Sequence, residues 1–266
     1  MEGSRSLSID LSAELAEPNQ QVSAHTKIGI RHRPLSTLPP ANHSATILRS
    51  PSVERRPEIL LMKNTAQLYL ITPSPFTANT LADVAAALAA GVDWLQFRGK
   101  GLSDQDAQRY ALELRALCRQ HQAQLFINDR IDLALAIDAD GVHLGQHDGS
   151  IADARRQLGR RKLGVTCHGD IELARRAVAE GADYVAFGRC FPSRTKPEAP
   201  PCELSVFTQA RNEFSVPIVA IGGITPDNGD QVLAAGADTL AVIDGVFGQH
   251  NIAAAVKRFH RLLGRV

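Results

Sequence analysis

The sequence is short of cysteine and of net charge, and it has no long apolar run. Only four cysteines occur among 266 residues, none in a C-x-x-C pair, so neither a zinc ribbon nor a disulfide framework is indicated. A net charge of +1 argues against a nucleic-acid-binding protein. There is no apolar run of about 18 residues that would predict a membrane span, and no secretory signal is visible. These absences favour a cytoplasmic protein without nucleic-acid or membrane partners.

Aromatic residues are missing altogether from residues 1–61, which hold six of the fourteen prolines. Such a segment cannot bury enough apolar surface to offset its ordering entropy, so we expect a disordered leader. Four acids among its first twenty residues argue against an acid-poor transit peptide. Met62 stands just before the first strand-like run. A translation start at Met62 is therefore a hypothesis, and it would leave residues 62–266 as the folded domain.

From Gln67 onward, short apolar runs alternate with helical patterns. The strand candidates are residues 67–72, 92–97, 124–128, 140–144, 162–166, 183–187, 216–221 and 239–243, and the helical stretches include 80–90, 103–120, 170–180 and 225–235. This alternation indicates parallel strands, because parallel strands need crossover connections that helices supply. Eight such units predict an α/β protein with a (β/α)8 TIM barrel of the phosphate-binding type. A doubly wound open sheet is the alternative.

Three near-repeats support regular strand–helix units. Residues 89–93, 179–183 and 234–238 read Ala-Ala-Gly-Val-Asp, Ala-Glu-Gly-Ala-Asp and Ala-Ala-Gly-Ala-Asp. In each, the glycine is placed to cap the end of a helix before the chain enters a strand.

Polar residues gather where the predicted strands end, which is where such barrels place their reactive groups. The second strand leads into Gln96-Phe97-Arg98-Gly99-Lys100. Alternate residues of a strand point to one face, so the amide and the two cations can converge on one ligand. The arginine guanidinium can make two parallel hydrogen bonds to phosphate oxygens, and the lysine ammonium supplies a compact positive charge, so both suit a diphosphate. A solvated charged loop is the alternative.

Two aspartates follow neighbouring strands and are candidate metal ligands. Asp129 comes after the third strand and Asp148 after the fourth. Two carboxylates beside phosphate groups are the usual protein share of a Mg²⁺ shell. Each could instead cap a helix, the first over 131–138 and the second near Ile151.

The histidines and hydroxyls near the strand ends have several possible roles. Thr166 ends the fifth strand, and its hydroxyl can bind substrate. His168 is the one plausible general base, with a structural role as the alternative. We expect His143, inside the fourth strand, to be packed or hydrogen-bonded, and His147 to be an exposed loop residue.

The last three strand ends carry a second set of candidate anion ligands. Ser193, Arg194, Thr195 and Lys196 lie in a proline-bounded loop, either a lid or anion clamp or a plain surface loop. The seventh strand ends in Gly222-Gly223 and the eighth in Ile243-Asp244. Barrels often hold a phosphate between the loops after these two strands, where glycines let backbone N–H groups approach it.

Together these blocks resemble the thiamine phosphate synthase family. The resembling segments are Q-F-R-G-K, N-D-R-I-D-L-A-L-A, A-D-G-V-H-L-G-Q-H-D, F-P-S-R-T-K and A-I-G-G-I-T-P-D-N, in this order between Leu68 and about Phe247. Their order and spacing together are specific, although each is weak alone. The resemblance implies a transferase of thiamine biosynthesis that joins a pyrimidine methyl diphosphate to a thiazole phosphate and releases pyrophosphate.

The resemblance also implies roles for individual residues. The pyrimidine diphosphate would be held by Gln96, Phe97, Arg98, Gly99, Lys100, Asn128, Thr166 and Lys196, of which Arg98, Lys100 and Lys196 would be the catalytic cations. Asp129 and Asp148 would bind the cofactor, Mg²⁺. The thiazole phosphate would be held by Ser193, Arg194, Thr195, Gly223, Ile243 and Asp244. No general base is required, which weakens the case for His168.

One position departs from the pattern, and two other functions compete. Asp244 stands where a small hydroxyl residue is common, and its carboxylate should repel a phosphate unless it turns away. Arg194 adds a cation that can offset it. A thiazole tautomerase of the same superfamily would use His168, but it needs no diphosphate–metal site. A non-catalytic, ligand-sensing barrel is the other rival, and nothing in the sequence resembles a DNA-binding module.

Overall fold

The computed structural model describes residues 66–195, 198 and 200–265, so the predicted leader and Lys196 lie outside the described residues. Within them, eight parallel strands close into a barrel in chain order, because β1 pairs with both β2 and β8. The strands are β1 (Gln67–Ile71), β2 (Trp94–Phe97), β3 (Gln124–Asn128), β4 (Gly141–Leu144), β5 (Lys162–Thr166), β6 (Tyr184–Phe187), β7 (Ile218–Ile221) and β8 (Thr239–Val242).

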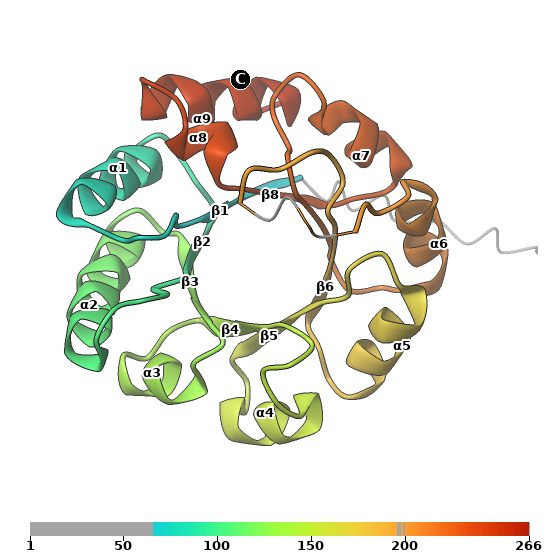
Figure 1. The fold of residues 1–266 in the computed structure, drawn as a ribbon, viewed down its shortest axis with the longest axis horizontal. Coiled ribbons are helices and arrows are strands. Elements are labelled where there is room, and N and C mark those ends of the chain that lie inside the picture. The colour runs from blue at the N-terminus through green and yellow to red at the C-terminus, as the bar shows by residue number, and fades with distance from the viewer. Residues whose placement is uncertain (1–65, 196–197, 199, 266) are drawn as a thin grey trace, which may run out of the picture. The chain divides into compact units, whose positions relative to one another are not determined.

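Helices surround the barrel as an outer ring (Figure 1). They are α1 (Ala78–Ala89), α2 (Asp104–Gln120), α3 (Ile131–Ala136), α4 (Ile151–Leu158), α5 (Ile171–Ala179), α6 (Ser205–Glu213), α7 (Gly229–Ala235), α8 (Asp244–Phe247) and α9 (Ile252–Leu262). Several begin at a side-chain cap, as where the Asp170 carboxylate accepts the backbone N–H groups of Glu172 and Leu173 at the start of α5.

The predicted barrel is confirmed, and the open-sheet alternative is wrong because the first and last strands are paired. The predicted strand boundaries differ from the observed ones by two residues at most. The three predicted glycine caps are also confirmed: Gly91, Gly181 and Gly236 end helices with φ of 100°, 101° and 122°. These angles lie in the left-handed region, where side chains other than glycine are strained.

The barrel has an inner and an outer apolar layer. Inside, the rings of Tyr69, Trp94, Phe126 and Tyr184 pack with centroids 5.1–6.0 Å apart. Residues that alternate with them along the strands point outward and pack against the helices. The four rings fill the interior, and the remaining space lies toward the carboxyl ends of the strands.

Four aspartates brace the opposite end of the barrel in one repeated arrangement, which we call the Asp–Arg clamps. Each aspartate stands directly before an even-numbered strand, accepts a backbone N–H from the start of the preceding odd-numbered strand, and pairs with an arginine. The clamps join Asp93, Leu68 and Arg265; Asp140, Leu125 and Arg115; Asp183, Leu163 and Arg155; and Asp238, Ile218 and Arg211.

The cysteines are free, and three of the four are buried. Burial raises the pKa of the Cys118 thiol to about 12, so this group behaves as a small apolar side chain. In the part of the chain that the structure describes, none of the helices has the length and apolar content to cross a membrane.

Candidate active site

A cavity of about 440 Å³ opens at the carboxyl ends of the strands. Ten of the predicted site residues line it: Gln96, Arg98, Asn128, Thr166, Ser193, Arg194, Thr195, Gly223, Ile243 and Asp244. They come from six strand ends that are far apart in the sequence. The structure thus brings the two predicted anion-binding sets to one cavity.

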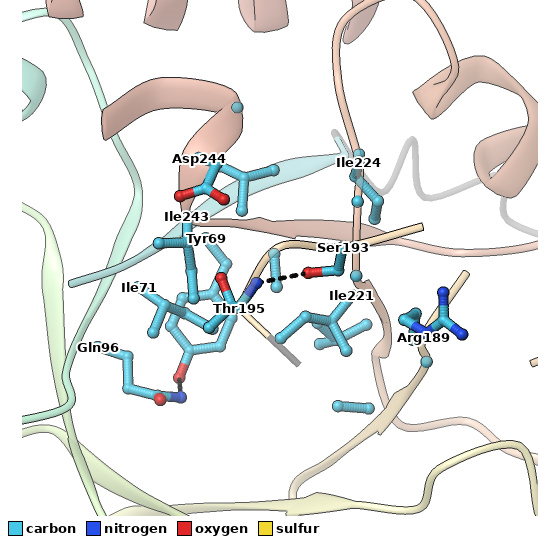
Figure 2. A pocket seen from close by; sticks show the side chains of 18 of the residues that line it. Tyr69, Ile71, Gln96, Arg189, Ser193, Thr195, Ile221, Ile224, Ile243 and Asp244 are labelled. Atoms are coloured by element: carbon cyan, nitrogen blue, oxygen red, sulfur yellow. Dashed lines mark hydrogen bonds between the residues drawn. The ribbon is translucent and has the colours of Figure 1, made fainter. Parts of the chain in front are cut away.

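The loops after β6 and β7 form one end of this cavity (Figure 2). Thr195 donates its backbone N–H to the Ser193 hydroxyl over 3.3 Å. Gly223 has φ of 64°, and a Cβ at this position would lie 2.3 Å from the carbonyl oxygen of Pro192. Only glycine therefore lets these two loops approach each other so closely.

Asn228 fixes the glycine loop and was not predicted as a site residue. Its side chain accepts the backbone N–H of Thr225 at 2.8 Å and donates to the carbonyl of Gly223 at 3.0 Å. The exposed Asp244 lines the same end of the cavity at the start of α8. Figure 2 shows its carboxylate on the side of the cavity where Thr195 lies.

The segment 96–100 divides between the cavity and its surroundings. Gln96 faces the cavity and donates to the Tyr69 hydroxyl at 2.9 Å. Arg98 also lines it, held by a backbone hydrogen bond to the Thr72 hydroxyl. Phe97 points the other way, with its ring centroid 5.1 Å from that of Phe76 in the outer layer. Its side chain is therefore buried away from the cavity, as strand alternation requires.

The two predicted metal ligands lie together beside the cavity. The carboxyl groups of Asp129 and Asp148 interact, and Lys100 Nζ lies 3.6 Å from Asp129 Oδ2. Burial and the Asp148 carboxyl raise the pKa of Asp129. Burial opposes ionisation of Asp148 too, but the Asp129 carboxyl, the hydrogen bond from the Gly145 N–H and the electrostatic effects of Lys100 and His143 together outweigh this and lower its pKa. The two carboxyl groups thus differ in acidity, and Asp148 is the stronger acid of the pair.

Neither aspartate caps a helix, so that alternative is wrong for both. The residue at the N-cap of α3 is Arg130, and that of α4 is Ser150, whose hydroxyl accepts the Asp153 N–H. Among the described residues there is no group of three or more His, Cys, Asp or Glu side chains that could hold a metal. Two carboxylates beside an open cavity nevertheless fit Mg²⁺, which keeps several waters and uses phosphate oxygens as further ligands.

The three histidines near the cavity differ in environment. His143 is buried and hydrogen-bonded to Tyr184 and Thr166, and His147 is exposed on a loop, as predicted. His168 lines the cavity with a left-handed backbone at φ 51°. Its position leaves the general-base and structural interpretations open.

Residues that the sequence did not single out complete the cavity wall. Tyr69, Ile71, Ala186, Val219 and Ala241 face inward from four strands. These residue types indicate no chemistry, but strand alternation predicts that they face the cavity. Each of them is an even number of positions away, along its strand, from a residue that faces inward.

Comparisons with known proteins show to which family the chain belongs. A family model described as thiamine monophosphate synthase matches residues 68–246. The thiamine-phosphate synthase of Methylobacillus flagellatus is 49% identical over 197 residues, covering 73% of this chain and 94% of that protein. That of Saccharophagus degradans is also 49% identical, over 193 residues, covering 71% and 89%.

A solved structure gives the same result. Thiamine phosphate pyrophosphorylase from Pyrococcus furiosus superposes with a TM-score of 0.70 at 33% sequence identity, covering 76% of this chain and 97% of that one. Both the matched segment and the relatives span nearly the whole barrel. The chain therefore belongs to the thiamine monophosphate synthase family and is a transferase with thiamine phosphate synthase activity.

Proposed function

We propose that the protein condenses 4-amino-2-methyl-5-(diphosphooxymethyl)pyrimidine with a thiazole phosphate in a Mg²⁺-dependent reaction that gives thiamine phosphate and pyrophosphate. The observation that carries this proposal is the Asp129–Asp148 pair beside a cavity lined by Arg98. A carboxylate pair next to cations suits a metal-bound diphosphate. The names of the relatives supply the product.

The two ends of the cavity suggest how the substrates are arranged. Gln96, Arg98, Asn128 and Thr166 would hold the pyrimidine diphosphate, with its phosphates toward Lys100 and the two aspartates. The loops after β6, β7 and β8 would hold the thiazole phosphate. Binding both in one cavity places the reacting atoms side by side, which is itself a large part of catalysis.

The reaction needs the breaking of one bond and the making of another. The C–O bond between the pyrimidine methylene and the diphosphate breaks, and its electron pair leaves with pyrophosphate. The thiazole nitrogen then donates its lone pair to the methylene carbon. Mg²⁺ would supply charge neutralisation of the leaving group. Arg98 and Lys100 would stabilise the same growing negative charge, and no protein nucleophile or general base is needed.

One assay tests the proposal. Purified full-length protein with both phosphorylated substrates and Mg²⁺ should form thiamine phosphate and pyrophosphate in equal amounts, and a chelator should stop the reaction. Full activity in the chelator would contradict the metal assignment. Isomerisation of a thiazole carboxylate phosphate, without condensation, would instead identify a tautomerase that uses His168.

A further inference from the structure

A chain of four hydrogen bonds crosses the floor of the cavity and links Gln96 to Thr166. Gln96 Nε2 lies 2.9 Å from the Tyr69 hydroxyl, which lies 2.9 Å from the Tyr184 hydroxyl. Tyr184 is 3.0 Å from His143 Nδ1, and His143 Nε2 is 2.8 Å from the Thr166 hydroxyl. The two end residues face the proposed diphosphate substrate, while the three middle ones have no role in the proposed reaction.

The three middle residues of this hydrogen-bond chain are buried and closely packed. Tyr69, Tyr184 and His143 are 1%, 0% and 8% exposed. The Tyr184 ring fills the space beside Gly164, where a Cβ would lie 1.9 Å from a ring carbon. Burial raises the pKa of both tyrosines above the ordinary value. Each hydroxyl therefore keeps its single proton at neutral pH and can donate only one hydrogen bond.

The direction of the chain is inferred from the protons that its members can give. The Gln96 amide donates to Tyr69, and Tyr184 is the other partner of this buried hydroxyl among the described residues, so the direction that uses every proton sends the Tyr69 proton to Tyr184. In this direction the Tyr184 proton goes to His143 Nδ1, which makes Nδ1 an acceptor. A neutral imidazole with an unprotonated Nδ1 carries its proton on Nε2. His143 therefore donates to the Thr166 oxygen, and the Thr166 proton is left for an acceptor in the cavity.

We propose that His143 is a positioning residue: the two tyrosines hold it as the Nε2–H tautomer, and in this form it makes the Thr166 hydroxyl a hydrogen-bond donor to an anionic oxygen of the substrate. At the other end, the same chain uses an N–H of Gln96 and leaves its Oε1 as an acceptor for a ligand amino group. This inference rests on the proposed function, which supplies a diphosphate and an amino group as the ligand partners.

The tautomer can be measured without any substrate. In full-length protein labelled with ¹⁵N-histidine, long-range ¹H–¹⁵N NMR should show Nδ1 of His143 in the unprotonated range and Nε2 in the protonated range. The signals that disappear in His143→Gln assign the residue. Tyr184→Phe removes the hydrogen bond that Nδ1 accepts, so the Nδ1 signal should move toward that of an unprotonated nitrogen without a hydrogen bond. A protonated Nδ1 in the wild type, or no change in Tyr184→Phe, would overturn the proposal.

Kinetics test the effect on the substrate. Tyr184→Phe should raise KM for the pyrimidine diphosphate about threefold or more, the scale of one hydrogen bond, and leave KM for the thiazole phosphate unchanged. Tyr110→Phe is the matched control, because Tyr110 is the one tyrosine outside the chain, and it should change neither constant. Equal rises in both KM values, together with a lower Tm, would show a merely structural role.

Two replacements of His143 separate donation from packing. His143→Gln can still place an amide N–H near the Thr166 hydroxyl, whereas His143→Leu cannot. The glutamine variant should therefore retain a lower KM for the diphosphate than the leucine variant, and equal values would overturn the inference. If the wild type forms no thiamine phosphate at all, the proposed function fails, yet the NMR result still decides the direction of the chain.

Discussion

Replacement of Asp129 with asparagine separates metal binding from the other roles of this side chain. Asp129 has a left-handed backbone with φ of 63°, which asparagine adopts more easily than alanine does. Asparagine keeps an oxygen at the same place and removes one negative charge. At a Mg–O distance of about 2.1 Å, that charge attracts Mg²⁺ by about 4 kcal/mol even in the dielectric of water. We expect a loss of about 2 to 4 kcal/mol, or a 30- to 700-fold higher Kd.

The metal-free variant should remain as stable as the wild type. The variant loses the ion pair between Asp129 and Lys100, whose side chains are 27% and 53% exposed, respectively. Such exposed pairs contribute at most about 1 kcal/mol to stability. It also loses repulsion from Asp148, which acts in the opposite direction. The expected Tm in a chelator is therefore within about 3 °C of the wild type. Turnover should fall steeply and recover in part at high Mg²⁺.

Calorimetric titration with Mg²⁺ and a diphosphate analogue, at several pH values, is the assay. Because only the ionised carboxylate binds metal, Mg²⁺ affinity should fall as pH drops through the raised pKa of Asp129. Asp148→Asn removes one cause of the raised pKa of Asp129, so in this variant the loss of Mg²⁺ affinity should occur at lower pH. Asp132→Asn, an exposed carboxylate paired with Arg130, is the control. Wild-type Mg²⁺ affinity in Asp129→Asn would refute the reasoning.

Two further substitutions test other parts of the molecule. Arg265 donates to both oxygens of Asp93 and to the Ala66 carbonyl. Arg265→Ala should therefore lower the free energy of unfolding by about 2 to 4 kcal/mol, and the Tm measured by calorimetry by roughly 4 to 16 °C. A Tm equal to that of the control Arg261→Ala, at an exposed arginine, would contradict this. Asp244→Ser removes a carboxylate from the proposed thiazole-phosphate end and should lower KM for that substrate. For charges roughly 6 Å apart the effect should be about tenfold even in the dielectric of water. A higher KM in steady-state assays would show that the carboxylate binds the substrate.

The sequence predicts the barrel well because its signals are local. Apolar runs, helical periods and the Gly-x-Asp endings each lie within one strand–helix unit, and eight repetitions leave little choice of topology. Strand alternation also places Gln96 toward the cavity. The same rule predicts that Phe97 points away from the cavity. The family resemblance instead implies that all of residues 96–100 contact the substrate, because it takes no account of alternation.

The finer geometry of the site depends on contacts that are distant in sequence. The left-handed backbone of Asp129 and its interaction with Asp148 have no periodic signal in the sequence. Tyr69 and Tyr184 meet across 115 positions, and nothing in either strand indicates that they do. The near-repeats predict their glycine caps, but they do not reveal that the aspartate two positions after each glycine has an equally regular structural role.

That regular role has a consequence for the continuity of the chain. The clamp of Asp93, Leu68 and Arg265 joins the segment after α9 to the start of β1, with the same kind of contacts that brace three other strand pairs. A circular permutant that connects residue 265 to residue 66 by a short linker, with new ends on a helix–strand turn without a clamp, would keep all four. In mechanical terms the four clamps brace the barrel as a closed ring, in which the junction between the last and the first unit is held like the other three.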